Sequence, residues 1–173
     1  VEAWVGEHFT VPWEPICAPD LLLAQALLRT KNIKLAPGAH LLPYHHPVEL
    51  AHRVAYLDHL AQGRFMLGVG ASGIPGDWAL FDVDGQNGEH REMTREALEI
   101  MLKVWTEDQP WEYRGKYWNA NGIAPMFEGL MKRHIKPQAL VPFVLTEGEA
   151  RQAMIRWMGS LWFAPGTLLE YAR

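Results

Sequence analysis

Three short segments carry the residues best suited to chemistry, and each one follows a run with the pattern of a β-strand. They are Glu7-His8, Gly38-Ala39-His40 and Gly68-Val69-Gly70-Ala71. In parallel α/β folds the loops and helix N-termini converge at the carboxyl ends of the strands, which is where ligands bind. We therefore expect the three segments to form one site.

His8 is the side chain in these segments best suited to acid–base or polarising work. Imidazole titrates near neutral pH and can donate a hydrogen bond to an oxygen that becomes negative during a reaction. A structural role, with the ring bonded to a backbone carbonyl, is the alternative. Its position at a strand end favours the functional interpretation, and the sequence leaves both open.

The glycines Gly68 and Gly70, with Gly73 after them, would let the backbone approach a ligand closely. Amides of this loop, including those of Val69 and Ala71, could face a phosphate or a flavin ring. The segment is a poor dinucleotide-binding fingerprint, because its last glycine comes too early and no acidic residue ends a strand about 20 residues later. A plain tight turn after a buried strand is the alternative.

Histidines raise the question of a metal site. Two of them, His52 and His59, fall on the polar side of an expected helix, where a solvated face explains them. No carboxylate or second histidine completes a ligand spacing on a shared element, so we expect no metal. The single cysteine, Cys17, excludes a disulfide within the chain, and we expect it to be a small buried side chain.

Aromatic residues lie in loops at the same expected edge as His8. Phe9, Trp13 and Trp78 could form the wall of an apolar substrate pocket. Aromatic residues on loops are also common as lids over a core, and this alternative stays open.

The expected elements alternate between strand and helix. Apolar residues at helical spacing and capping residues predict three helices, and apolar runs predict three strands between them. The strands are expected at about 3–6, 33–42 and 64–69, and the helices at about 20–29, 47–63 and 90–105. This order is typical of parallel βα units, which close into a barrel or form an open, doubly wound sheet. Residues 111–118 are expected to form a short hairpin or an insertion.

Composition narrows the class of protein. The 173 residues carry a formal net charge of −4 with scattered Lys and Arg, which makes a nucleic-acid partner unlikely on electrostatic grounds. No apolar run approaches the ~20 residues needed to cross a bilayer, and no signal segment opens the chain. We expect a cytoplasmic protein without a membrane partner.

Several motifs together resemble the bacterial-luciferase-like flavin-dependent monooxygenases. They are EHFT at Glu7–Thr10, LPYHHP at Leu42–Pro47, LDHLAQGRF at Leu57–Phe65, and GVG at Gly68–Gly70, in the same order and spacing. In addition, GKYW at Gly115–Trp118 resembles the limonene and diketocamphane monooxygenase branch of the family.

The resemblance implies an α/β fold, a (β/α)8 TIM barrel that is usually dimeric, with FMN lying across the carboxyl ends of the strands. It implies that His8 matches the active-site histidine, and that Gly38-Ala39 matches a non-prolyl cis peptide beside the isoalloxazine ring. Gly70 stands where luciferase has a reactive cysteine. The implied flavin-binding residues are Gly38, Ala39, Gly68, Val69, Gly70 and Ala71.

The implied reaction uses reduced FMN from a separate flavin reductase and O2, through a C4a-(hydro)peroxyflavin, to oxygenate a small apolar carbonyl compound or terpene. A deazaflavin-dependent oxidoreductase on the same barrel and a non-catalytic flavin-binding protein are the alternatives. A complete barrel typically needs ~250 residues. We therefore expect residues 1–173 to be one partial barrel domain, with segments missing before residue 1 and near 138–140.

Overall fold

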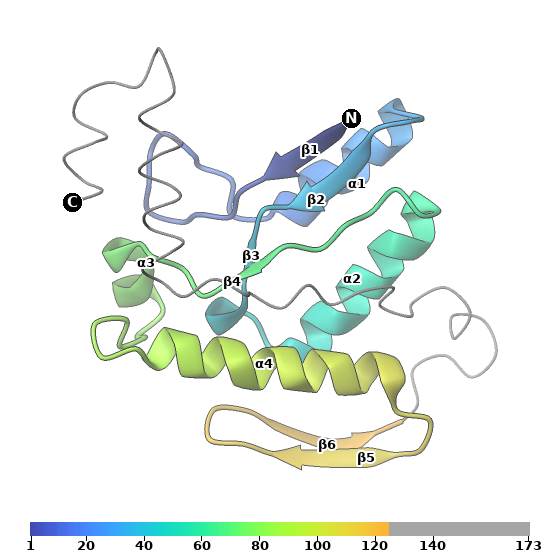
Figure 1. The fold of residues 1–173 in the computed structure, drawn as a ribbon. Coiled ribbons are helices and arrows are strands. Elements are labelled where there is room, and N and C mark those ends of the chain that lie inside the picture. Colours follow the sequence, from blue (N-terminus) through green and yellow to red (C-terminus); the bar gives the residue numbers. More distant parts are fainter. Residues whose placement is uncertain (125–173) are drawn as a thin grey trace, which may run out of the picture. The chain divides into compact units, whose positions relative to one another are not determined.

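The computed structural model describes residues 1–124, all of which lie in one unit of the chain, Val1–Lys136. The expected features near 138–140 lie outside the described residues. The elements are β1 (Glu2–Val5), α1 (Pro19–Arg29), β2 (Lys34–Pro37), β3 (His40–Leu41), the 3-10 helix η1 (Leu42–Tyr44), α2 (Pro47–Ala61), β4 (Val69–Gly70), α3 (Pro75–Leu80), α4 (Glu89–Thr106), β5 (Trp111–Arg114) and β6 (Asn119–Ile123) (Figure 1).

The first four strands run parallel. β1 pairs with β2, and β3 pairs with β4. The Gly38 amide donates to Val5 O at 2.7 Å, and the Gly68 amide donates to Pro37 O at 3.2 Å. Successive strands therefore lie side by side with their carboxyl ends at one edge (Figure 1).

The expected strand over 33–42 is interrupted. β2 ends at Pro37, β3 begins at His40, and the peptide bond between Gly38 and Ala39 is cis. The cis bond that the family resemblance implied is thus confirmed. The strand expected over 64–69 is also reduced, because Phe65 forms a single bridge to Leu35 and the regular ladder begins at Val69.

The three expected helices are present. Proline at the first position starts α1 and α2, where the missing N–H costs no hydrogen bond. The left-handed C-cap of α2 is Gln62, with φ 50°, and Gly63 after it is also left-handed. One helix was not expected: residues 75–80 form α3, which also opens on proline.

Two apolar clusters hold the helices against the strands. One joins η1, α2 and α4, and the other joins α1 and α2 to β2. The first contains Leu42, Leu50, Ala51, Val54, Ala97, Ile100, Met101 and Val104, and the second contains Leu23, Leu27, Leu35, Leu57 and Ala61. Trp105 Nε1 also donates to Ala51 O at 3.0 Å and ties α4 to α2.

The expected hairpin is confirmed as the antiparallel pair β5–β6. Glu96 of α4 accepts hydrogen bonds from the backbone amides of Lys116, Tyr117 and Trp118, which anchors the turn of the hairpin to the helix. Cys17 is exposed, so the expectation of a buried thiol was wrong. Within residues 1–124, no helix is long and apolar enough to cross a membrane.

Candidate functional site at the carboxyl edge of the strands

The glycine-containing segments meet at the carboxyl edge, as expected. The His40 amide donates to Gly68 O at 2.9 Å, and Leu41 pairs with Gly70. A Cβ built at Gly70 would lie 3.4 Å from Ala39 Cβ, so these two backbones are in contact distance. His8 follows β1 at the same edge, because Val5 O binds the Gly38 amide.

This edge presents open backbone. Gly38 is exposed, and Ala39 and residues 68–71 are partly exposed. The half-exposed Trp4 side chain lies against Gly38 and Gly68, and a Cβ added at Gly38 would be 3.1 Å from it. A Cβ at Gly68 would be 2.6 Å from Pro37 O, which no side chain could tolerate. Glycine at these two positions therefore lets the two strands approach each other and leaves space for the Trp4 side chain.

His8 lies between two carboxylates. Its Nδ1 is 3.4 Å from Asp77 Oδ2, its Nε2 is 3.5 Å from Glu14 Oε2, and its side chain is 23% exposed. Because an acceptor lies beside each ring nitrogen, the two carboxylates fix the orientation of the imidazole without selecting one tautomer. The ring is therefore held in place and still reachable from solvent.

Asp77 connects the His8 loop to α3. Its carboxylate is fully buried and accepts hydrogen bonds from the Phe9 amide at 3.3 Å, the Thr10 amide at 2.8 Å and the Thr10 hydroxyl at 2.6 Å. One carboxylate thus fixes the backbone directly after His8. This function of Asp77 was not expected from the sequence, although an acidic residue in a first helical turn after proline is a recognisable signal.

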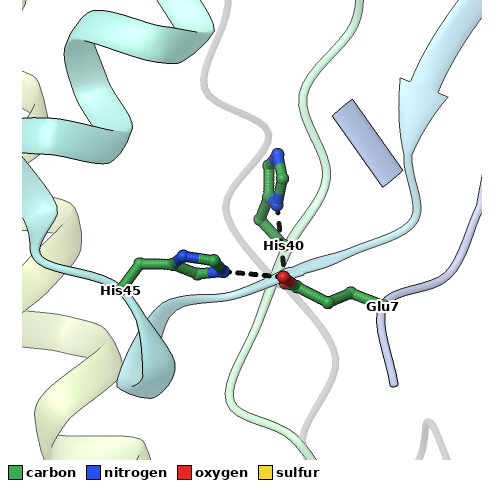
Figure 2. A group of neighbouring side chains, drawn as sticks. All are labelled: Glu7, His40 and His45. Carbon is green, nitrogen blue, oxygen red and sulfur yellow. Dashed lines mark hydrogen bonds and ion pairs between the residues drawn. The ribbon is translucent and has the colours of Figure 1, made fainter. Parts of the chain in front are cut away.

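Glu7, adjacent to His8, belongs to a separate buried cluster. Its Oε2 accepts from the Leu41 amide at 2.7 Å and lies 3.4 Å from His40 Nδ1. Its Oε1 lies 2.7 Å from His45 Nε2. Figure 2 shows the two rings approaching the carboxylate from different sides. The carboxylate is fully buried and the His40 ring is 1% exposed.

The cluster continues toward the helices through Arg53 of α2. Arg53 Nη2 lies 3.3 Å from His45 Nδ1, and Arg53 Nε lies 3.0 Å from the buried carboxylate of Asp20 in α1. Polar contacts therefore run from the end of β1 to the first turn of α1. The carboxylates of Glu7 and Asp20 are buried, whereas the Arg53 side chain is 34% exposed.

The environment of Glu7 controls its ionisation. Burial alone would raise its pKa, but hydrogen bonds from His40 and His45, the Coulombic effect of His45 and a hydrogen bond from the Leu41 amide outweigh burial and lower the pKa to about 2. Glu7 is therefore ionised at neutral pH.

The three residues expected in a substrate pocket lie in different surroundings. Phe9 packs edge-on against Phe81 at 4.7 Å and Tyr44 at 5.7 Å between ring centroids. Trp78 lies beside His90, with ring centroids 5.0 Å apart. Trp13 is 77% exposed. Their assignment to a pocket stays a prediction.

Parallel βα units with polar groups and glycines at the carboxyl edge of the strands are the architecture of α/β-barrel enzymes. Residues 2–159 match the family model of the luciferase-like monooxygenases. The chain belongs to this family, and its described βα units form part of the family's (β/α)8 barrel.

The relatives include monooxygenases from several bacteria. The chain is 44% identical over 109 residues to 4-hydroxyprotoasukamycin monooxygenase from Streptomyces nodosus subsp. asukaensis, covering 63% of this chain and 29% of that protein. It is 42% identical over 136 residues to 3,6-diketocamphane 1,6-monooxygenase from Pseudomonas putida, covering 72% and 35%. The chain thus spans about a third of the length of these relatives.

A solved structure agrees with this assignment. The oxygenating constituent of 3,6-diketocamphane monooxygenase from Pseudomonas putida, a type II Baeyer-Villiger monooxygenase in complex with FMN, has a TM-score of 0.66 and 41% identity to this chain. The match covers 69% of this chain and 33% of that one.

Proposed function

We propose that the protein is the oxygenase component of a two-component monooxygenase that uses reduced FMN and O2 to oxygenate a small apolar carbonyl compound or terpene. A separate flavin reductase supplies the reduced FMN. The observation that carries the proposal is the open backbone edge formed by Gly38, Ala39 and residues 68–71 in a chain 41% identical to an FMN complex.

The residues at this edge fit a flavin. A planar ring can lie against backbone that carries small side chains, and Gly38, Ala39 and Gly70 provide such backbone at a partly exposed edge. When bound, reduced FMN would supply the electrons that activate O2. The chain's own contribution is to position the ring against Gly38 and Gly70 and to limit the access of water.

His8 is the residue that we assign to proton handling. Asp77 orients its Nδ1 side, while the ring remains accessible at the end of β1. An imidazole held in this way can donate to an oxygen on which negative charge develops. Phe9, adjacent to His8, contributes to an apolar surface together with Tyr44 and Phe81, which suits an apolar substrate.

Other cofactors and functions are less well supported. The F420-dependent neighbours are 24% and 23% identical, and this level of similarity concerns the fold alone. The other alternative is a flavin-binding protein without catalytic activity. Such a protein would bind FMN but would yield no oxygenated product.

The test mixes the protein with photoreduced FMN, O2 and a bicyclic ketone, and measures product and hydrogen peroxide. We expect ketone-dependent product, and His8→Ala should reduce product per reduced flavin about a hundredfold and raise peroxide, since losing such a hydrogen bond costs ~3 kcal/mol. His59→Ala, on an exposed position of α2, is the control. No product with any ketone or terpene, despite tight FMN binding, would contradict the proposal.

A further inference from the structure

We infer that Glu7 is a positioning residue, which holds the backbone of residues 38–41 at the flavin-facing edge through the Leu41 amide and two histidines. The inference rests on the proposed flavin site. It assigns the Glu7 cluster to hydrogen bonding rather than to metal binding.

The contacts of Glu7 converge on one short segment. The carboxylate comes from the end of β1, and it binds the Leu41 amide at 2.7 Å and His40 Nδ1 at 3.4 Å. These two residues directly follow Gly38-Ala39 in the chain. The second oxygen binds His45, just after η1, at 2.7 Å. A single buried group therefore fixes the chain from the carboxyl edge to the start of α2.

The direction of the hydrogen bond between His45 and Glu7 follows from Arg53. A guanidinium can only donate, so His45 Nδ1, 3.3 Å from Arg53 Nη2, must accept. His45 Nε2 then carries the proton of the neutral ring and donates it to Glu7 Oε1. Both oxygens of Glu7 face donors, and an amide in its place would direct its NH2 group at one of them.

A metal ion does not fit this arrangement, although Glu7, His40 and His45 offer ligand atoms within 4.8 Å of one another. A metal on His45 Nε2 would leave the proton on Nδ1, where it would face the guanidinium of Arg53. Histidines that bind metals usually donate their second N–H to a carboxylate, a carbonyl or water. The Arg53 contact is the opposite of that pattern.

The ionisation of Glu7 is consistent with this function. Burial would raise the pKa of Glu7, but the hydrogen bonds that it accepts from His40, His45 and the Leu41 amide act in the opposite direction and lower the pKa. The charged and titratable groups around it include His40 of β3, Tyr44 of η1, His45 after η1, and Arg53 of α2, which is paired with Asp20 of α1.

The experiment uses the full chain labelled with 15N and 13C. Imidazole nitrogen spectra at neutral pH should show His45 as a neutral ring protonated at Nε2, a result that needs no variant. Glu7→Gln should change this signature and weaken FMN binding, followed by flavin fluorescence, at least tenfold. Glu7→Ala, which removes both acceptor oxygens, should increase the exchange rate of the Leu41 amide at least a hundredfold. Glu49→Gln is the matched control, because Glu49 also pairs with Arg53 but is 58% exposed.

Each contrary outcome is distinct. A His45 ring protonated at Nδ1, or a Leu41 amide equally protected in Glu7→Ala, overturns the inference. Tetrahedral Co(II) absorbance in the unchanged chain that disappears in Glu7→Gln overturns it in favour of a metal site. Equal FMN affinity in both proteins removes the link to flavin. Failure of the unchanged chain to bind FMN contradicts the proposed function instead, and the His45 and Leu41 measurements still decide what Glu7 does.

Discussion

Glu7 and His8 are neighbours in the sequence, but their side chains belong to two different environments. Glu7 is fully buried and binds one backbone amide and two histidines. His8 is 23% exposed and lies between Asp77 and Glu14. The first group is closed to ligands, whereas the second can be reached by them.

The difference in burial assigns different functions to the two residues: Glu7 positions the backbone, and His8 is available for proton transfer. A buried carboxylate whose two oxygens both accept hydrogen bonds stabilises the fold, because those hydrogen bonds form in surroundings of low dielectric constant. A partly exposed imidazole contributes less to stability, because solvent replaces much of what its contacts provide. We therefore expect substitutions at Glu7 to lower stability and, through the backbone that it holds, flavin binding, whereas substitutions at His8 should change the reaction with little effect on stability.

The largest expected effect is that of Glu7→Ala. The change leaves the Leu41 amide and the His45 Nε2–H without their acceptor and Arg53 less well compensated, and breaking a buried charged network costs about 4 kcal/mol. Urea unfolding followed by tryptophan fluorescence measures it. His8→Ala should lower the unfolding free energy by less than about 1 kcal/mol. Equal losses in the two variants would contradict the comparison.

Lowering the pH should reduce the free energy of unfolding through the Glu7 carboxylate. The pKa of Glu7 falls from 4.5 to about 2 on folding, so its ionised form stabilises the fold above pH 4.5, and this contribution is lost as the pH falls toward 2. The loss should amount to about 3 kcal/mol. Unfolding at a series of pH values measures it, and Glu7→Gln should show a flatter profile. Identical profiles would mean that Glu7 titrates normally.

Asp77→Ala tests the environment of His8. It removes the acceptor for the Phe9 and Thr10 amides, so we expect a loss of about 2 kcal/mol and faster exchange of both amides. The control is Asp84→Ala, since Asp84 is exposed and binds Asn87 within its own loop. Protection of residues 9 and 10 that survives the substitution would show that the His8 loop is held by other contacts.

The smallest expected effect concerns the two acidic partners of Arg53. Glu49→Gln should cost roughly 0.5 kcal/mol, because this exposed pair, 3.6 Å apart, is screened by water. Asp20→Asn should cost more, since Asp20 is buried and lies 3.0 Å from Arg53. Thermal unfolding of both variants tests the order, and a reversed order would mean that burial does not control the strength of these pairs.

The family assignment and most of the elements could be predicted from the sequence. The spacing of Ala97, Ile100, Met101 and Val104 predicts the buried face of α4, because helical periodicity is a local property. The turn at Gly115 is local in the same way. The cis bond at Gly38-Ala39 was expected from the family resemblance, whereas strand patterning predicted one continuous strand through this point.

The tertiary structure alone decided which residues form the Glu7 cluster. His40 is 33 positions from Glu7 and Asp77 is 69 from His8, and neither pair follows a spacing rule. Such partners meet because parallel strands bring their carboxyl ends to one edge, and because successive side chains near a strand end point to different sides. The sequence by itself determined that edge and the residue types on it. Which carboxylate is buried, and which histidine remains accessible, depends on contacts between distant segments that no local pattern encodes.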